Sequence, residues 1–450
     1  MIAPEWTRLD NAAIIYPSCR TRRYATQYRM SATLDKDVSA SVLDMALKNI
    51  MPRFPGFSYT LSKGFFWWYL RRLDNEPSAH LHETMNVFSL RDNGGFMFKV
   101  GCSGCKITLD VFHALTDGTG AMTFLMTLTS EYLRLKEDTA PVYGKWVFNP
   151  LEKADREEME DSFDSFSGLK GNLDKEEKAW HVPGKSIRFD ELENINVSLS
   201  AADVVAKAAG FGCTVTEFLS SLMLYSLQEI WKEDKSSRKS PFIVVEIPVN
   251  LRPIYGSRTL RNFSSYIHVG LDVRNGFFSL EEIVRDIRMQ KRLYMQKSRL
   301  TTRVAANQAL EDNLAIRCIP LFIKKHAINI INNMKGDTYC TYTFSNLGNI
   351  EIGGDAGRYV KGLDFILGRT RRRSGACACV SCNGKLSLNF SRRIQGCEFE
   401  KTFLGHLNEL DIDASVDFTK VAERQERRRI KKTCTMKRSR IGLASSLLFI

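Results

Sequence analysis

The chain has 450 residues, a hydrophobic share of 44% and a formal net charge of +13. This length is too great for one simple core and predicts two lobes of about 150–200 residues each. Residues 423–450 supply +7 of the charge, from nine Lys and Arg against two Glu, so the remaining chain lacks the strongly basic balance of a nucleic-acid-binding protein.

The first lobe begins with a predicted helix. Apolar residues recur at helical spacing over residues 38–50, and Asp37 is a suitable N-cap for them. Pro52 cannot continue the pattern and would end this helix. The lobe is expected to extend to about residue 150.

A strand-turn-helix pattern follows in the same lobe. Residues 95–112 favour two short strands joined by a turn at 101–104. The second strand alternates and delivers His113 at its end. After Asp117 and Gly118, small residues and an apolar stripe predict a helix. The segment Phe112-His113-Ala114-Leu115-Thr116-Asp117-Gly118 therefore forms a strand-to-helix turn.

The rest of the chain indicates a linker and a second mixed lobe. Residues 152–164 hold seven acidic and two basic residues, which is typical of a solvated linker. Thr214 with Glu217 and Ser279 with Glu282 have the spacing of capping boxes. The expected division is an N-terminal lobe over 1–150, an acidic linker over 151–186, a C-terminal lobe over 187–422 and a basic tail over 423–450. Strands are expected at 242–249, 339–344, 376–381 and 386–390, and helices at 199–209, 215–232 and 279–297.

The turn carries residues suited to acid–base chemistry. Acyl transfer to a hydroxyl needs a base of near-neutral pKa within hydrogen-bond reach, and histidine is the natural choice for His113. Asp117, four residues later in a tight turn, is better placed to pair with an arginine and fix the loop than to reach the imidazole. Gly118 permits a positive φ or a close approach of backbone or cofactor.

The segment FHALTDGTGAMTFL resembles the H-x-x-x-D-G region of the chloramphenicol-acetyltransferase-like superfamily of CoA-dependent acyltransferases and condensation domains. It is most similar to the bacterial alcohol acetyltransferase branch. Five other segments resemble this branch in the expected order: Trp6–Ala13, Val249–Pro253, Thr259–Phe263, Thr343–Gly348 and Asn383–Ile394.

The resemblance implies an α/β (α+β mixed) fold of two lobes, each a mixed sheet flanked by helices, with an active-site tunnel between them. It also implies transfer of an acetyl or other acyl group from acyl-CoA to a small alcohol, with His113 as the general base and no permanently bound cofactor. Asp117 would be structural. Its candidate partners are Arg20, Arg22, Arg23 and Arg252, among which the sequence does not choose. Ser345 or Asn346 would donate to the oxyanion, although a strand-terminating turn explains both equally well.

One departure bears on the donor. Condensation domains usually show two adjacent histidines, but Phe112 stands at the first position here, which favours a CoA donor. Two alternatives stay open: a phosphopantetheine carrier protein as donor, and a relative that binds without turnover.

Other partners and ligands are expected as follows. Cys102 and Cys105 form a lone C-x-x-C without two further ligands, so no metal site is predicted. With no secretory signal, a cytoplasmic location with reduced thiols is expected. The basic tail ends in an apolar segment, residues 441–450. This tail could be disordered, dock as a helix or make weak contact with an anionic membrane surface, and no nucleic-acid partner is expected.

Overall fold

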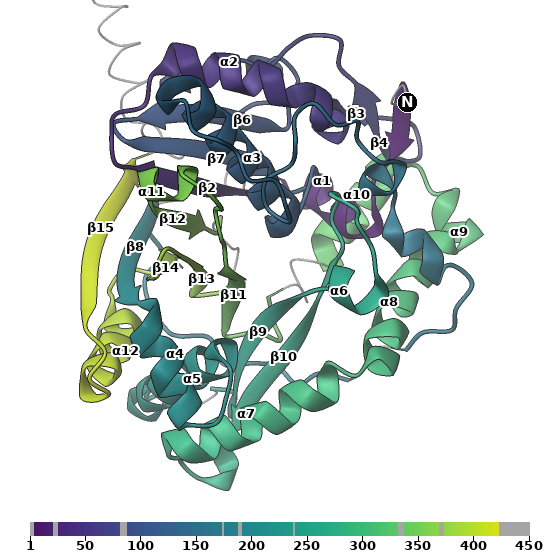
Figure 1. Ribbon diagram of the computed structural model, residues 1–450. Helices are drawn as coiled ribbons and strands as arrows, with labels where there is room; N and C mark the ends of the chain where they lie inside the picture. Colours follow the sequence, from purple (N-terminus) through teal and green to yellow (C-terminus); the bar gives the residue numbers. More distant parts are fainter. Residues whose placement is uncertain are drawn as a thin grey trace, which may run out of the picture.

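The computed structural model describes residues 4–20, 26–81, 88–172, 175–187, 191–236, 239–331, 337–368 and 373–422. The tail over 423–450, together with Arg22 and Arg23, lies outside these ranges. Within them the chain forms a mixed α/β molecule whose sheets divide between an upper and a lower half in Figure 1. The helices are α1 (Ile15–Cys19), α2 (Ala40–Ile50), α3 (Gly118–Glu137), α4 (Ala201–Gly210), α5 (Val215–Glu233), α6 (Arg252–Tyr255), α7 (Leu280–Tyr294), α8 (Lys297–Asp312), α9 (Leu314–Arg317), α10 (Leu321–Ile331), α11 (Ala356–Tyr359) and α12 (Glu398–Glu409).

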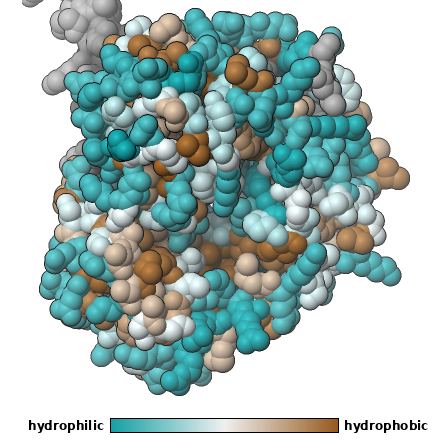
Figure 2. Space-filling model, viewed as in Figure 1, coloured by the Kyte–Doolittle hydropathy of each residue, from teal (hydrophilic) through white to brown (hydrophobic). Residues whose placement is uncertain are grey.

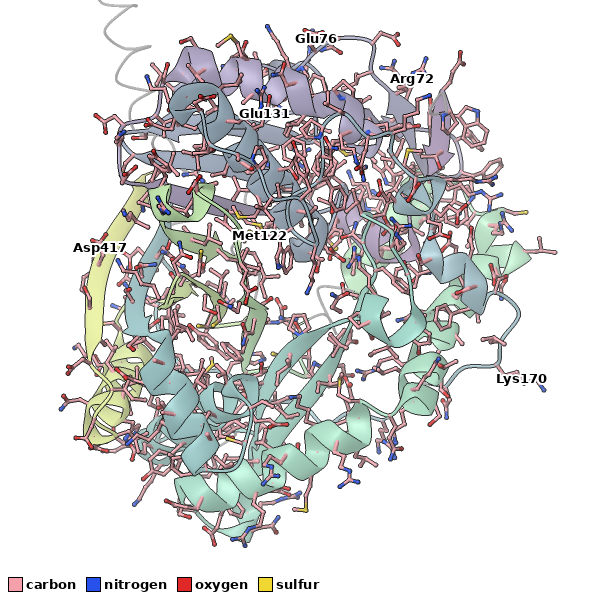
Figure 3. All side chains as sticks on the ribbon, in the orientation of Figure 1. Arg72, Glu76, Met122, Glu131, Lys170 and Asp417 are labelled. Carbon is pink, nitrogen blue, oxygen red and sulfur yellow. The ribbon has the colours of Figure 1, made fainter. Side chains whose placement is uncertain are left out.

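The upper half is built on a five-stranded sheet with α2 and α3 on one face (Figure 1). Its order is β12 (Val360–Ile366), β2 (Gln27–Leu34), β7 (Lys106–Phe112), β6 (Phe98–Ser103) and β5 (His80–Leu81). A small sheet beside it has the order β1 (Trp6–Arg8), β4 (Trp68–Arg72) and β3 (Tyr59–Lys63). Met122 of α3 is fully buried in the core beneath that helix, and Figure 3 labels it there.

The lower half holds a seven-stranded sheet. Its order is β10 (Ser264–Asp272), β9 (Phe242–Asn250), β11 (Tyr342–Asn349), β13 (Gly375–Cys382), β14 (Lys385–Arg392), β8 (Glu191–Ser200) and β15 (Ala414–Ala422). Side chains alternate along β13, so Cys377 and Cys379 enter the core of the lower half, whereas Ala378 and Val380 enter the core of the upper half. The sheet is therefore buried on both faces at this strand.

One strand crosses between the expected lobes. β12 comes late in the chain but pairs antiparallel with β2, adding an edge to the upper sheet. It also packs against β13 and β14 of the lower sheet. No sequence pattern predicted this crossing, which connects the two halves through one continuous segment.

Several local predictions are confirmed. Both capping boxes are present, at Thr214 with Glu217 and at Ser279 with Glu282. β9, β13 and β14 lie at the expected positions, and Asn383-Gly384 forms the turn between the last two. α3 begins at Gly118, directly after the predicted turn.

Other boundaries were wrong. Ser39 rather than Asp37 occupies the N-cap position of α2, without a side-chain hydrogen bond. The β6–β7 hairpin turns at Gly104 and Cys105, because β6 continues through residues 101–103. The helix expected over 279–297 ends at Tyr294.

The acidic linker is not simply solvated. Glu158 is buried and accepts two hydrogen bonds from the Arg53 guanidinium, at 2.5 and 2.8 Å. Phe163 and Phe166 are buried in the core of the lower half. Lys170, at the edge of the molecule in Figure 3, is exposed as expected. The segment thus anchors itself to both halves at a few points, and its charged majority faces water.

Candidate active site

His113 lies at the end of β7, where its backbone N–H donates to the carbonyl of Thr26 at 3.0 Å. Its imidazole is partly buried between two tyrosines. The Tyr16 ring stacks on it at 4.2 Å between centroids, and Tyr28 meets it edge-on at 5.0 Å. Tyr28 in turn donates to the Thr116 carbonyl at 2.9 Å. The ring plane of His113 is thereby held from two sides.

The hydrogen bonds of Asn262 select the tautomer of His113. The Asn262 amide nitrogen is 3.3 Å from Oδ2 of Asp10. This oxygen also faces the Arg261 guanidinium at 3.6 Å and therefore acts as an acceptor, so the Asn262 oxygen faces His113 Nδ1 at 3.1 Å. Nδ1 therefore carries the hydrogen and donates to this oxygen. The lone pair is left on Nε2, in the plane of the ring, and the hydroxyl of the stacked Tyr16 lies 3.4 Å from this nitrogen over the ring face.

The protonation states fit this arrangement. Burial lowers the pKa of His113 below its ordinary value, although the nearby Asp117 carboxylate and Asn262 act in the opposite direction. The ring is therefore neutral at neutral pH, as a general base requires. Burial also raises the pKa of Tyr16, so its phenol stays protonated.

Asp117 is the centre of a buried polar cluster between the two halves. The Arg252 guanidinium donates to both of its carboxylate oxygens, at 2.8 and 3.0 Å. The backbone N–H of Phe263 donates to the same carboxylate at 3.0 Å. The N–H groups of Thr119 and Gly120 donate as well, at 3.1 and 3.2 Å, which makes Asp117 the N-cap of α3.

These contacts decide the charge of Asp117. Burial by itself raises the pKa of the carboxyl, but Arg252 and the backbone donors outweigh it, so the pKa lies below its ordinary value. Arg252 uses its remaining donors on the carbonyls of Thr259 and Arg261 and on the side chain of Asn250. A fully satisfied ion pair of this kind fixes the turn that carries His113 against the lower half.

Close backbone packing explains the small residues after Asp117. A Cβ at Gly120 would lie 2.2 Å from Thr116 Oγ1 and 2.3 Å from the carbonyl oxygen of Leu260. Thr116 itself donates to that carbonyl at 2.5 Å. At Gly118 φ is not positive, and the constraint is a close approach, since a Cβ would lie 2.9 Å from Leu347 Cδ2.

Neither a family model nor a curated protein matches the sequence. Solved structures do match in fold. TRI3 trichothecene 15-O-acetyltransferase from Fusarium sporotrichioides has a TM-score of 0.58 at 14% identity, over 90% of this chain and 94% of that one. TRI101 of F. sporotrichioides, complexed with coenzyme A and T-2, has a TM-score of 0.58 at 12% identity, over 91% and 99%. The first condensation domain of the CDA synthetase has a TM-score of 0.57 at 14% identity, over 91% and 96%.

The chain has the chloramphenicol-acetyltransferase-like fold. These similarities do not separate the bacterial branch from the others.

Within this acetyltransferase-like fold, the other residues predicted for the site lie in different places. Arg20 donates to the carbonyl of Phe88 and stacks over the ring of Phe112, away from Asp117. Asn346 bonds to Thr216 of α5, on the helix side of the lower sheet. Ser345 is its neighbour on β11, so strand alternation gives it the opposite face, which is also that of Leu347 beside Gly118.

The sequence did not single out Tyr16, Asn262 or Asp10. Two of them lie inside segments that carried the family resemblance, Asp10 in Trp6–Ala13 and Asn262 in Thr259–Phe263. The sequence therefore pointed to these segments, but only the packing of the two halves against each other shows which side chains Asp10 and Asn262 contact. Tyr16 had no sequence signal.

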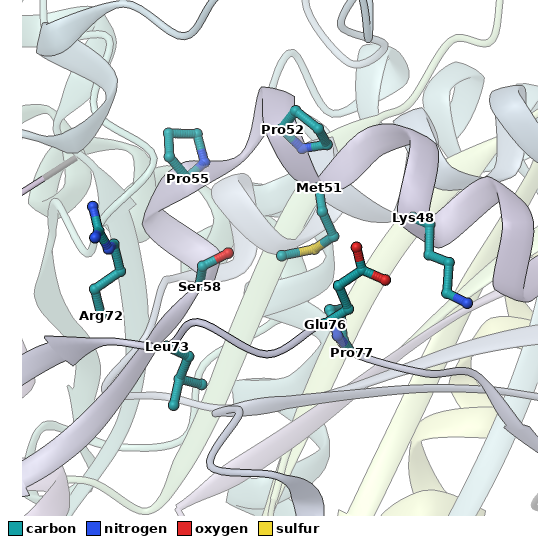
Figure 4. Close-up of a pocket in the computed structure, with 9 residues that line it drawn as sticks. All are labelled: Lys48, Met51, Pro52, Pro55, Ser58, Arg72, Leu73, Glu76 and Pro77. Atoms are coloured by element: carbon teal, nitrogen blue, oxygen red, sulfur yellow. The ribbon is translucent and has the colours of Figure 1, made fainter. Parts of the chain in front are cut away.

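Other candidate sites lie elsewhere or are absent. The surface is hollowed between the two halves in Figure 2. A separate hollow, shown in Figure 4, lies between the end of α2 and the segment after β4 and shares no residue with the His113 site. Over the described ranges, no group of three His, Cys, Asp or Glu side chains could hold a metal ion.

Proposed function

We propose that this protein transfers an acyl group from acyl-CoA to the hydroxyl of a small alcohol, with His113 as general base. The observation that carries the proposal is the hydrogen bond from His113 Nδ1 to Asn262, which leaves a lone pair on Nε2 in the plane of the imidazole ring. A neutral imidazole held in one tautomer and one orientation is what proton removal from an alcohol requires.

The reaction needs no acyl-enzyme, because the thioester is already activated. As the alcohol oxygen attacks the thioester carbonyl, its proton passes to Nε2 of His113. The tetrahedral intermediate then expels the CoA thiolate, which takes the proton from the imidazolium, leaving ester and free CoA. The neutral base is restored, and atoms and charge balance.

The surrounding residues have supporting roles in this proposal. Asn262 and the two tyrosine rings position His113, and the ion pair of Asp117 with Arg252 positions the turn. Ser345, on the face of β11 shared with Leu347, is the proposed donor to the developing oxyanion. The acceptor hydroxyl would donate to the Nε2 lone pair in the plane of the imidazole ring.

The fold supports the choice of substrates. One of the similar structures is a trichothecene 15-O-acetyltransferase, and another contains coenzyme A together with T-2. Phe112 is fully buried, so the position of the first histidine in condensation domains is a core position here. This favours CoA over a carrier-bound donor.

The test is a screen of acyl-CoA donors against pooled alcohols, read as release of free CoA. His113→Ala is expected to lower kcat/KM by about 10²–10⁴-fold while CoA still raises the melting temperature. Activity within a few-fold of the unsubstituted protein would refute the role of His113. A carrier-dependent enzyme would show no stabilisation by CoA and would turn over only with acyl carrier protein.

A further inference from the structure

A group of large apolar side chains is exposed beside the helix that carries Tyr16. It combines the tip of the β3–β4 hairpin with α9, α10 and the residues between them, and we call it the hairpin–α10 patch. Its members and their exposed fractions are Phe65 (69%), Phe66 (41%), Leu314 (74%), Ile319 (36%), Phe322 (59%) and Ile323 (48%).

Hydrogen bonds connect the β3–β4 hairpin to α10 within the hairpin–α10 patch. The backbone N–H of Leu321 donates to the Phe65 carbonyl at 2.8 Å. Lys324 donates to the Phe66 carbonyl at 3.1 Å, and its ammonium lies 3.3 Å from the centroid of the Trp67 ring. In Figure 1, α9 forms one edge of the molecule, and brown side chains reach the surface at the same edge in Figure 2. The exposed apolar groups thus share one surface.

The segments that form the hairpin–α10 patch carry charge of one sign. The sequence contains no Asp or Glu between Asp312 and Asp337; of the basic residues there, Arg317 and Lys325 are partly exposed, whereas Lys324 is buried. It also contains none over residues 63–72, where Lys63 and Arg71 are exposed. A second copy of this surface would therefore be repelled, and an anionic partner would be attracted.

The hairpin tip also has a composition suited to a lipid surface. Four aromatic residues follow one another at positions 65–68, flanked by the basic residues at 63 and 71. Aromatic rings favour the headgroup level of a bilayer, and lysine and arginine beside them pair with anionic lipids. Large aliphatic side chains on α9 and α10 supply apolar area that can enter the acyl boundary.

We propose that the hairpin–α10 patch binds the protein to an anionic lipid surface. No helix over the described ranges is long and apolar enough to span a membrane, so the attachment is peripheral. α10 packs against α1, whose Tyr16 stacks on His113. If the proposed function holds, the acceptor or acyl chain reaches the site from a membrane.

The experiment is flotation of the full chain with vesicles of phosphatidylcholine containing 30 mol% phosphatidylglycerol, roughly the charge of an anionic leaflet, and with vesicles of phosphatidylcholine alone. The chain is expected to float with the anionic vesicles only. Phe65→Ser with Phe322→Ser is expected to reduce partitioning by more than about tenfold, because two aromatic side chains no longer enter the bilayer. Lys325→Glu is expected to reduce it by at least about fivefold.

A matched pair of substitutions controls for folding and for exposed apolar area in general. Leu151→Ser with Phe277→Ser changes side chains that are 92% and 52% exposed outside the hairpin–α10 patch, and should float like the unsubstituted protein. Equal melting temperatures establish that all variants are folded. Each of three outcomes overturns the proposal. The first is that the chain does not float with anionic vesicles. The second is that the patch variants float as well as the unsubstituted protein, which would assign binding to residues 423–450. The third is that the chain binds an acidic protein and not the vesicles.

These outcomes are separate from those that test catalysis. Flotation requires no turnover. Activity toward water-soluble substrates is expected to be unchanged in the patch variants, because none of the substituted side chains contacts His113.

Discussion

Replacing Asp117 by Asn tests whether the buried ion pair holds the turn that carries His113 in place. The substitution keeps the shape of the side chain but removes its charge and turns one acceptor oxygen into a donor. If Oδ1 is retained toward the N-terminus of α3, the new amide faces Arg252 Nη1 and the N–H of Phe263, which now donate to Oδ2 at 2.8 and 3.0 Å. Asn is itself a good N-cap, so α3 should still begin here.

The expected loss of stability follows from the Arg252 guanidinium, which the substitution leaves without its carboxylate partner. Arg252 is buried, with a side-chain exposure of 9%, and would lose its only carboxylate partner among the described residues. Removing one member of a buried ion pair costs about 3–5 kcal/mol in the free energy of unfolding. The pair joins α3 to α6, so part of this loss should appear as looser docking of the halves, and a displacement of His113 by about 1 Å lowers kcat by about 10²-fold.

The pH dependence of the free energy of unfolding gives a second test of the ion pair. The pKa of Asp117 is lowered on folding, so its contribution to stability is present above the unfolded value of about 4 and is lost as pH falls through the folded pKa. The stability difference between the unsubstituted protein and Asp117→Asn should therefore be constant near neutral pH. It should narrow below about pH 4.

Urea unfolding followed by tryptophan fluorescence, combined with kcat/KM, is the assay. Asp110→Asn is the control, because Asp110 is equally buried and pairs with Arg29 at 2.6 and 2.7 Å, within the upper sheet and away from Arg252. This control should lose similar stability but keep its activity. An Asp117→Asn variant as stable and active as the original, or an inactive Asp110→Asn variant, would refute the reasoning.

Three further substitutions, one of them with a control, test the remaining geometry. Gly120→Ala should destabilise the protein by about 3 kcal/mol or more and lower its activity, because the new Cβ would overlap a backbone carbonyl. Its control is Gly405→Ala in α12, where nothing lies within 4 Å of the new Cβ. In the same unfolding assay this control should be stabilised by about 0.5–1 kcal/mol. Tyr16→Ala removes the ring that stacks on His113, so kcat should fall by at least about tenfold because the imidazole loses one of the contacts that hold its orientation; an unchanged kcat contradicts this. Asn262→Ala frees the imidazole tautomer and should lower kcat by at least about tenfold with an unchanged dissociation constant for CoA, measured by calorimetry; full activity would show that Asn262 does not orient the base.

Local sequence determined the elements whose signals are short-range. The capping boxes at residues 214 and 279 begin helices as predicted, because each is closed by hydrogen bonds three residues apart. The turn from β7 to α3 was predictable for the same reason, since alternation ends at Phe112 and small residues follow Asp117. The family resemblance drew attention to the segments that meet at the site.

Long-range docking decided the rest. β12 joins the upper sheet across more than 300 residues of chain, and no local pattern reports such a pairing. Four arginines were equal candidates for Asp117, and the tertiary structure places Arg252 at the start of α6 within 3.0 Å of it. The tautomer of His113 likewise depends on Asn262, 149 residues away. The sequence by itself determined which residue could act as a base, and the tertiary structure decided which nitrogen carries its lone pair, because hydrogen-bond partners are set by distance in space rather than along the chain.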